Sequence, residues 1–356
     1  MKQPRRSGTR TDRSRLVRVL VGTAAILGTT AVLVRARARR TERRHPPVGR
    51  FITADRVRLH YYERGQGRPI VLLHGNGGTL DELLSSGLVD HLAQNHRVIA
   101  FDRPGFGYSE RPRSRLWTPA AQARLIRDAL DRLGVKEALV YGHSLGAQVA
   151  VCLALDAPDL VRGLVLASGF LYPTARTDVL VAITPAIPLV GHVLRYTLAP
   201  ILARLLLRRI YTKIFGPSPV PERFLREFPH GLVLRPWHLR AVAADTAFLI
   251  PAAAAMHERY ASLEMPVTIV TGDSDRVVDF TRQSRRLHEA IAGSRLIIIP
   301  GAGHMIHHAA AGVIADAVES LSAEVFRGRI EGSRGRKHLM GPTDRKVSRR
   351  PAATLA

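Results

Sequence analysis

The stretch from residue 138 to residue 147 reads Ala-Leu-Val-Tyr-Gly-His-Ser-Leu-Gly-Ala. An apolar run of the kind that forms a buried strand leads into it, and a run compatible with a helix leaves it. Gly142 and Gly146 flank Ser144 at the spacing of a sharp strand-to-helix turn, where a Cβ would collide with the neighbouring backbone. The pattern predicts that Ser144 is held out of the turn, within reach of a base and a substrate. A Gly-x-Ser-x-Gly stretch also occurs in ordinary tight turns, so its meaning depends on the rest of the chain.

Short β-type runs and helical runs alternate from residue 51 to residue 326. Thr118 and Pro119 are typical of a helix start, and the periodic run behind them ends near Gly134. A further helix is predicted over His307–Phe326. The predicted strands are a hairpin over Phe51–Arg64 and the runs Pro69–His74, His96–Phe101, Ala138–Tyr141, Arg162–Ala167, Pro266–Thr271 and Arg295–Ile299. This alternation predicts an α/β fold with a mostly parallel sheet that helices cover on both faces.

Residues 171–262 interrupt this rhythm. They lack β alternation, contain many prolines and include Leu198–Phe215, in which arginines are interleaved with Leu and Ile. We interpret them as a helical lid over the edge of the sheet at which Ser144 lies. The predicted organisation is then a basic N-terminus (1–50), a first part of the core (51–170), the lid (171–262), a second part of the core (263–326) and a basic tail (327–356). The tail is rich in Arg, Gly, Ser and Pro and is expected to be disordered.

The formal charge of +24 on the 356-residue chain lies mostly in its two ends. Residues 1–50 carry 14 Lys and Arg against 2 acids, and residues 327–356 carry 9 against 2. No zinc-ligand spacing, RNP-like aromatic motif or helix-turn-helix pattern accompanies this charge, so specific nucleic-acid binding is not predicted. Anionic lipid headgroups are a more natural partner for basic ends.

The N-terminal part contains an apolar segment, residues 16–34, that only Arg18 interrupts. At about 1.5 Å per residue a helix of this length spans roughly 28 Å, close to the thickness of the hydrocarbon core of a bilayer. The alternative is a secretory signal peptide with cleavage near Ala36-Arg37-Ala38. The arginines around that site and the length of the apolar run favour an uncleaved membrane anchor. Seven basic residues, Arg18 included, precede the uncharged run 19–34 and seven follow it, so the positive-inside rule does not choose a membrane side.

A serine attacks a carbonyl group well only when a base takes its proton, a third group orients the base and donors meet the developing oxyanion. Candidates for the acid and the base follow two predicted strands. Asp273, Asp275 and, further on, Asp279 come after the strand that ends at residue 271, and His304 comes after the strand that ends at residue 299. His307 and His308 are alternatives to His304, although their place in the first turn of the predicted helix is more typical of partly exposed side chains.

Four signatures occur together in this order: Leu73-His74-Gly75-Asn76-Gly77-Gly78, Asp102-Arg103-Pro104-Gly105-Phe106-Gly107-Tyr108-Ser109, Gly142 to Gly146, and the pair Gly272-Asp273-Ser274-Asp275 and Gly301-Ala302-Gly303-His304. With them the chain, from about Phe51 to Phe326, resembles the lidded serine hydrolases of the α/β-hydrolase superfamily, which include esterases and lipases. Each signature alone is weak, whereas four in register are specific. The resemblance implies the α/β-hydrolase fold.

The resemblance also implies a role for each site residue. Ser144 would be the nucleophile, His304 the general base and then acid, and Asp275 the carboxylate that orients the imidazole. The family's Gly-x-x-Asp spacing favours Asp275 over Asp273. The backbone N–H groups of Asn76 and Leu145 would form the oxyanion hole.

Other residues near these motifs are candidates for the substrate pocket. His74, Gly75 and His143 flank the site, and the two histidines are expected to hydrogen-bond to loop backbone and to touch substrate less readily. The segment from Asp102 to Ser109 is interpreted as a turn stabiliser at the edge of the site. No metal and no organic cofactor is predicted, because these histidines lack ligand spacing and no Gly-x-Gly-x-x-Gly follows the first strand.

The serine at position 144 narrows the choice among relatives. Haloalkane dehalogenases and epoxide hydrolases of this fold use aspartate there, so Ser144 argues against both activities, even though Asn76 is similar to the dehalogenase pattern. We expect a membrane-associated enzyme that hydrolyses lipophilic carboxylic esters through an acyl-enzyme. The alternatives are a carbon–carbon bond hydrolase, a haloperoxidase-like enzyme, an acyltransferase, or a non-enzymatic binding module on the same fold. The sequence does not indicate an oligomeric state.

Overall fold

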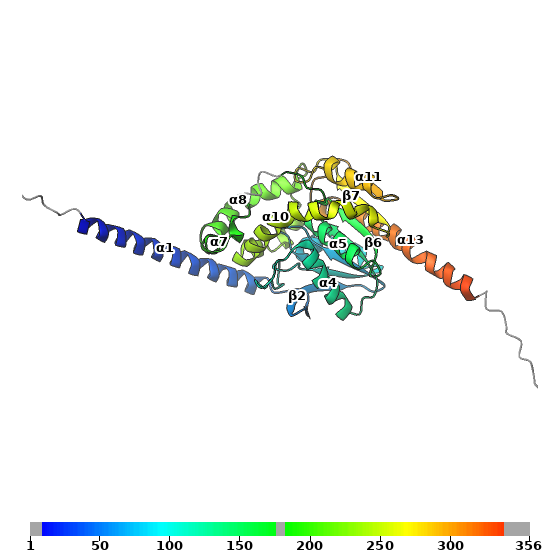
Figure 1. Cartoon of the computed structure of the whole chain (residues 1–356), viewed down its shortest axis with the longest axis horizontal. Helices are drawn as coiled ribbons and strands as arrows, with labels where there is room; N and C mark the ends of the chain where they lie inside the picture. The colour runs from blue at the N-terminus through cyan, green and yellow to red at the C-terminus, as the bar shows by residue number, and fades with distance from the viewer. Residues whose placement is uncertain (1–8, 176–181, 338–356) are drawn as a thin grey trace, which may run out of the picture.

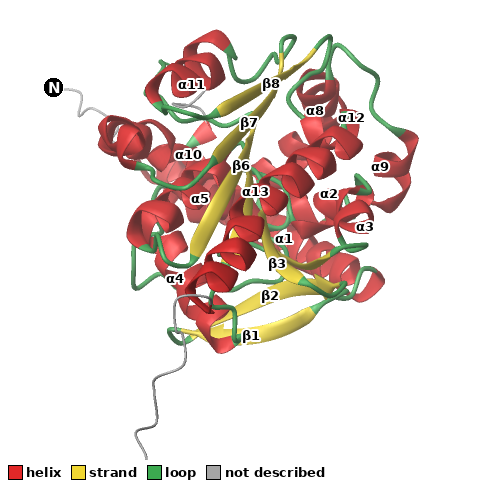
Figure 2. Cartoon of the chain, turned by 90° about the vertical axis from the view of Figure 1, so that its right-hand side faces the viewer, coloured by secondary structure: helices red, strands yellow, loops and turns green. Residues whose placement is uncertain are grey.

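The computed structural model describes residues 9–175 and 182–337. In this part of the chain an eight-stranded sheet has the order β1-β2-β4-β3-β5-β6-β7-β8 (Figure 2). β2 pairs antiparallel with β1 and with β4, and all other neighbours are parallel. The strands are Arg50–Ala54 (β1), Val57–Arg64 (β2), Arg68–Leu73 (β3), His96–Phe101 (β4), Ala138–His143 (β5), Val161–Ala167 (β6), Val267–Gly272 (β7) and Arg295–Ile299 (β8).

Helices cover both faces of the sheet (Figure 2). The α-helices of the described residues, including those outside these two layers, are Thr9–Arg44 (α1), Leu80–Ser85 (α2), Leu88–Leu92 (α3), Pro119–Arg132 (α4), Leu145–Asp156 (α5), Val190–Tyr196 (α7), Leu198–Phe215 (α8), Glu222–Glu227 (α9), Pro236–Met256 (α10), Arg286–Ala290 (α11), Ile306–Ala309 (α12) and Ala311–Lys337 (α13). Val71 and Leu73 of β3 join a core with α4, α5, α10 and α11, while Ile70 and Leu72 join one with α2, α3, α12 and α13. Side chains of a strand point alternately to opposite faces, so two buried faces require an apolar residue at every position. The predicted α/β-hydrolase fold is confirmed.

Helix α4 begins where the sequence predicts. The Thr118 side chain accepts a hydrogen bond from the N–H of Ala121 at 3.2 Å, and Pro119 occupies the first turn. This bond pairs one of the N–H groups that a helix start leaves without an intrahelical partner.

Loss of this cap should have a measurable effect on stability. We expect Thr118→Ala to lower the free energy of unfolding by about 1 kcal/mol, because the first turn of α4 loses its side-chain acceptor. Thr118→Ser keeps the hydroxyl and should stay close to the wild type in urea unfolding. Equal stability of Thr118→Ala and Thr118→Ser would show that the cap contributes nothing.

The segment between β6 and β7 contains a cap, residues 182–240, that lies at the carboxyl ends of the parallel strands. The cap includes α7, α8 and α9 and continues into α10. The second half of α10 leaves the cap, because Leu249, Ala253 and Met256 are buried in the core beside α5. The predicted lid range 171–262 therefore contains a segment that belongs to the main core.

Helix α1 extends away from the body as one uninterrupted helix (Figure 1). Within Ser14–Arg44 an 18-residue window has a mean hydropathy of 1.9, so this helix is long and apolar enough to cross a membrane. An 18-residue window within Pro236–Ser262, with a mean hydropathy of 1.4, also meets this criterion, although α10 packs within the body. The predicted apolar segment 16–34 lies inside α1.

Two predictions for the C-terminal region were wrong. The predicted helix His307–Phe326 is divided at Ala310, where α12 ends and α13 begins one residue later. The alanine-rich sequence favours an unbroken helix, so the break follows from tertiary packing, since α12 buries Ile306 and His307 completely. The backbone of residues 327–337, predicted to be disordered, continues α13, because extending an existing helix costs less than starting one. The predicted disorder of residues 338–356 lies outside the described residues.

Candidate active site

Ser144 stands at the turn between β5 and α5, with φ +53° and ψ −116°. A Cβ on Gly142 would lie 2.6 Å from the carbonyl oxygen of Gly146, and a Cβ on Gly146 would lie 2.3 Å from that of Leu73. Both positions therefore require glycine. A serine at positive φ is strained, and such strain persists only where the surrounding structure enforces it. The geometry is that of the sharp strand-to-helix turn that the sequence predicts.

His304 and Asp275 meet Ser144 at the carboxyl edge of the sheet. The Nε2 atom of His304 lies 3.1 Å from Oγ of Ser144, and its Nδ1 lies 2.8 Å from Oδ2 of Asp275. Asp275 follows β7 and His304 follows β8, and both side chains are buried. Two hydrogen bonds of normal length thus join an alcohol, an imidazole and a carboxylate from distant parts of the chain.

Asp275 is held as an ionised carboxylate. Burial by itself raises the pKa of this carboxyl, but the charge and hydrogen bond of His304 and two backbone N–H groups lower the pKa below its usual value. These N–H groups belong to Val277 and Val278, at 2.7 and 2.9 Å from Oδ1. An ionised acceptor fixes the tautomer in which His304 carries its proton on Nδ1 and presents a lone pair from Nε2 to Ser144.

The structure does not bring the alternative acids to the imidazole. Asp273 is exposed and accepts hydrogen bonds from the N–H of Gly301 and the hydroxyl of Ser274. Asp279 is also exposed and accepts from the backbone N–H of Arg282. Both carboxylates are occupied away from His304.

The loop after β3 and the start of α5 face Ser144. Leu145 is the first residue of α5, so its N–H is one of the donors that a helix start leaves free. Asn76 lies in the loop of residues 75–78, and its Nδ2 donates to Oγ1 of Thr246 at 2.9 Å, which ties this loop to α10. Asn76 and Leu145 both line the same cavity as Ser144 and His304.

This cavity has a volume of about 310 Å³ and is mostly apolar. Gly75 and His143 are among its lining residues, as the sequence predicts for the pocket. The cap contributes most of the apolar wall, through Ala203, Leu207, Ile210, Tyr211, Ile214, Phe224, Phe228, Val233, Leu234 and Leu239. No Arg or Lys is found among the lining residues in the described ranges.

His74 is buried below the cavity and does not line it. Its Nδ1 donates to the carbonyl oxygen of Gly75 at 2.7 Å, and its Nε2 accepts from the backbone N–H of Arg103 at 3.0 Å. Burial lowers the pKa of His74 to about 4, so the ring is neutral and one nitrogen can accept. Both nitrogens of His74 thus hold loop backbone, which is the role that the sequence analysis favoured for this candidate over contact with substrate.

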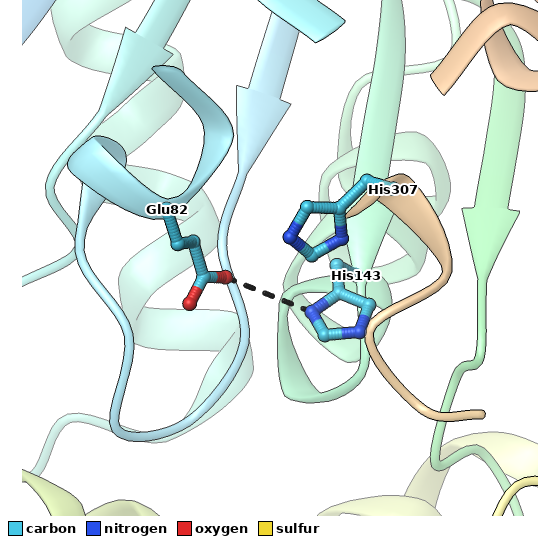
Figure 3. A group of neighbouring side chains, drawn as sticks. All are labelled: Glu82, His143 and His307. Atoms are coloured by element: carbon cyan, nitrogen blue, oxygen red, sulfur yellow. Dashed lines mark ion pairs between the residues drawn. The ribbon is translucent and has the colours of Figure 1, made fainter. Parts of the chain in front are cut away.

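Glu82, His143 and His307 form a buried polar cluster (Figure 3), and His143 directly precedes Ser144 in the chain. His143 donates from Nε2 to the carbonyl oxygen of His304 at 3.0 Å, and its Nδ1 faces Oε1 of Glu82 at 3.7 Å. Each residue offers one atom within 4.8 Å of the others, a set that could hold a metal ion. The expectation of a metal-free site stays a prediction. Through His143 the cluster supports the backbone of His304.

Sequence reasoning missed parts of this cluster. His307 was expected to be partly exposed, but it is fully buried, because α12 turns it inward against the ring of His143 at 4.6 Å between centroids. Burial and the neighbouring histidines keep its pKa well below the usual value, so the ring is neutral. Glu82 was not a candidate at all. A carboxylate within a short apolar helix was the signal that could have drawn attention to it.

Comparisons with known proteins show which family and which proteins this chain resembles. The family model described as alpha/beta hydrolase fold matches residues 68–311. An uncharacterized protein of Mycobacterium tuberculosis is 31% identical over 272 residues, which cover 74% of this chain and 77% of that protein.

One further relative and one solved structure of similar fold have named activities. A 2-hydroxymuconate semialdehyde hydrolase of Pseudomonas putida is 34% identical over 145 residues, which cover 40% of this chain and 52% of that enzyme. A thermophilic esterase from Thermogutta terrifontis has a similar structure, with a TM-score of 0.65 and 19% identity over 78% of this chain and 98% of the esterase. The esterase is similar in fold, and the family match rests on sequence.

Proposed function

The chain belongs to the alpha/beta hydrolase family, and from this premise we propose that it is a serine hydrolase that cleaves lipophilic carboxylic esters. The observation that carries the proposal is the pair of hydrogen bonds that link Ser144, His304 and Asp275, at 3.1 and 2.8 Å. This is the arrangement that activates a hydroxyl for attack on a carbonyl group.

In the proposed mechanism Oγ of Ser144 attacks the ester carbonyl carbon while its proton passes to Nε2 of His304. The resulting tetrahedral intermediate expels the alcohol, which takes the proton back from Nε2, and an acyl-Ser144 ester remains. Water then repeats the sequence, with His304 as base and then acid, and releases the carboxylic acid. Asp275 stays ionised throughout and stabilises the imidazolium that forms in each half of the reaction.

The negative charge that develops on the carbonyl oxygen needs donors. We assign this role to the backbone N–H groups of Asn76 and Leu145, which flank Ser144 in the cavity. Loss of one such donor typically costs about 3 to 4 kcal/mol in the activation barrier. The bonds from Asn76 to α10 and from the N–H of Gly75 to Oε1 of Glu82 at 3.3 Å hold the loop in place for this task.

The cavity lining supports an uncharged acyl group. Aliphatic and aromatic side chains of the cap form its wall. Burial of a methylene group against such a wall contributes about 0.8 kcal/mol, so each carbon added to an acyl chain can strengthen binding while room lasts.

The Pseudomonas putida relative gives a specific reason to consider carbon–carbon bond hydrolysis as a second candidate. Its substrate, as named, carries a carboxylate, and a buried carboxylate requires a cationic or hydrogen-bonding partner. Among the described lining residues Glu82 is the one carboxylate, which would repel an anion, and none is Arg or Lys. This charge balance favours a neutral ester.

We further propose that α1 anchors the enzyme in a membrane. No residue of its apolar window is buried inside the protein, and its end is fixed to the body by an ion pair of Glu42 with Arg235 at 2.8 Å. The alternative signal-peptide site, residues 36–38, lies inside the continuous helix, and Ala38 is buried against the body. Cleavage there would require this helix to open, which favours the anchor.

A substrate panel tests the proposed activity. We expect p-nitrophenyl esters to be hydrolysed with kcat/KM rising from acetate to longer acyl chains, because the wall of the cavity is apolar. 2-Hydroxymuconate semialdehyde should be turned over far more slowly. A clear preference for acetate would contradict the lipophilic specificity, and faster turnover of the ring-fission product would replace ester hydrolysis by carbon–carbon cleavage. Analysis of products with added alcohol would separate a hydrolase from an acyltransferase.

A further inference from the structure

Helices α7 and α8 expose a large apolar surface. The outer face, as we name it, consists of Leu189, Val190, Val193, Leu198, Ile201, Leu202, Leu205 and Leu206, all of them exposed. Monomeric soluble proteins rarely leave a contiguous apolar patch of this kind uncovered. The two helices together are apolar enough for a membrane segment, but they are bent by 59° where they meet, so they form a corner instead of a straight crossing.

The opposite face of α8 lines the catalytic cavity. Ala203, Leu207, Tyr211 and Ile214 recur at helical spacing and face Ser144, whereas Leu198, Leu202 and Leu205 recur on the outer face. A helix that is apolar on both faces is usually buried on both. Helix α8 is thus a single wall between the cavity and whatever covers the outer face.

The position of α1 indicates that a membrane covers the outer face. A hollow between α1 and the cap is lined by Leu33, Val34 and Arg37 on one side and by Ile201 and Arg204 on the other. The apolar part of α1 ends at residue 34 and basic residues follow it. If α1 spans a membrane, residue 34 lies at the boundary of the hydrocarbon layer, and the start of α8 lies at the same depth.

Two further contacts fix this geometry. The guanidinium of Arg35 stacks over the ring of Tyr196, between α7 and α8, at 4.7 Å from its centroid. The hydroxyl of Tyr108 donates to the carbonyl oxygen of His45, just beyond the end of α1. In Figure 1 the corner of α7 and α8 lies on the side of the body from which α1 extends. The outer face is therefore turned toward the plane in which α1 enters the membrane.

The charges on α8 also suit a lipid surface. Arg204, Arg208, Arg209 and Lys213 are exposed among the apolar residues, and no acidic residue lies within α8. A helix of apolar and basic residues that lies in the interface buries its apolar side among acyl chains and pairs its cations with anionic headgroups.

We propose that the outer face of α7 and α8 lies in the headgroup region of an anionic bilayer, and that α8 is the gate through which a membrane-dissolved lipid ester enters the Ser144 cavity. The substrate class is an uncharged acyl ester that resides in the bilayer. The identification of the substrate rests on the proposed ester hydrolase activity, whereas the docking of the outer face does not.

Docking is tested on the full-length chain in vesicles of phosphatidylglycerol and phosphatidylethanolamine. Leu205, 74% exposed, is replaced by Cys and labelled with an environment-sensitive dye, in a Ser144→Ala background that makes the result independent of catalysis. The native Cys152 is buried, and burial raises the pKa of its thiol to about 12, so it should not react. Leu116→Cys is the matched control, since Leu116 is 73% exposed and lies outside the cap.

We expect the dye at position 205 to shift to the blue and to be quenched by lipids that carry nitroxide on their acyl chains. The dye at position 116 should emit as it does in water and should not be quenched. If the dye at both positions emitted as it does in water and was not quenched, the outer face would not dock on the bilayer. This conclusion would hold whether or not the enzyme hydrolyses esters.

Substrate entry is tested in the active enzyme with Leu205→Asp and its control Leu116→Asp. We expect Leu205→Asp to reduce hydrolysis of a palmitoyl ester dissolved in the vesicles by about tenfold or more, because a charge replaces a leucine that docking would bury in the bilayer. Hydrolysis of water-soluble p-nitrophenyl acetate should stay within about twofold of the wild type. An equal loss with both substrates, or an equal loss in Leu116→Asp, would overturn the gate. Absence of ester hydrolysis in the wild-type enzyme would instead contradict the proposed function.

Discussion

Ser144→Ala is expected to reduce kcat for ester hydrolysis by about 10⁵- to 10⁶-fold and to abolish labelling by a fluorophosphonate probe. The substitution removes Oγ, to which His304 offers its Nε2 lone pair at 3.1 Å. Without this atom no acyl-enzyme forms, and only the donors of the oxyanion hole and substrate binding remain to accelerate hydrolysis. Initial rates with a p-nitrophenyl ester and gel detection of a fluorescent probe measure the two effects.

The control for this prediction is Ser168→Ala. Ser168, like Ser144, is a serine at positive φ; it is buried directly after β6, and its hydroxyl has no hydrogen-bond partner among the described residues. Ser168→Ala should keep both activity and labelling, and thermal unfolding should show that both variants are folded. Persistent labelling of Ser144→Ala would remove Ser144 from the role of nucleophile.

The features that the sequence predicted well depend on local patterns. The turn at Ser144 needs two glycines two residues away on either side, and the cap of α4 needs Thr118 directly before Pro119. The strands were recognisable because strands buried on both faces are continuous apolar runs. His304 and Asp275 were found because each follows such a strand, and carboxyl ends of parallel strands meet at one edge.

The features that the sequence did not predict depend on contacts between distant residues. Glu82 faces His143 because α2 lies over the turn after β5, which no pattern around residue 82 indicates. His307 is buried because the chain breaks at Ala310, against the helix propensity of its neighbours. The course of α10 from cap to core likewise follows from packing. The composition of residues 327–337 suggested disorder, whereas the helix preceding them determined their backbone.

Another of these distant contacts is the ion pair of Arg103 and Asp245, whose side chains are fully buried and 2.6 Å apart. Arg103 also donates from Nε to the carbonyl oxygen of His74 at 2.9 Å and from Nη2 to that of Gly75 at 3.0 Å. One side chain thus joins α10 to the loop that carries Asn76. The segment from Asp102 to Ser109, predicted to stabilise the turn at the site's edge, acts in this way through a residue whose partner is far away in sequence.

Arg103→Ala is expected to lower the free energy of unfolding by about 3 to 5 kcal/mol, because it leaves the carboxylate of Asp245 buried with one of its two arginines. The second arginine is Arg111, at 2.8 Å. Ester turnover should fall as well, since the loop before Asn76 loses two of its donors. Urea unfolding monitored by tryptophan fluorescence measures the first effect, and kcat of the folded variant measures the second.

The pH dependence of this loss has a defined sign. Burial raises the pKa of Asp245, but Arg111 and Arg103 outweigh it and lower the pKa below the usual value near 3.8. A carboxyl whose pKa is lower in the folded state stabilises the protein above its unfolded pKa and loses this effect as the pH falls through the folded pKa. The difference between wild type and Arg103→Ala should therefore stay constant from pH 7 to about 5 and shrink below about 4.

An exposed ion pair provides the control. Lys136 and Asp131 are 2.7 Å apart but largely exposed, so Lys136→Ala should leave unfolding almost unchanged. A double-mutant cycle with Asp245→Ala isolates the coupling, and removal of both partners should cost less than the sum of the single losses, because neither Arg103 nor Asp245 then leaves the other unpaired. If Arg103→Ala unfolded at the same urea concentration as Lys136→Ala, the buried pair would not be what holds the loop to α10, and the bond from Asn76 to Thr246 would have to do so.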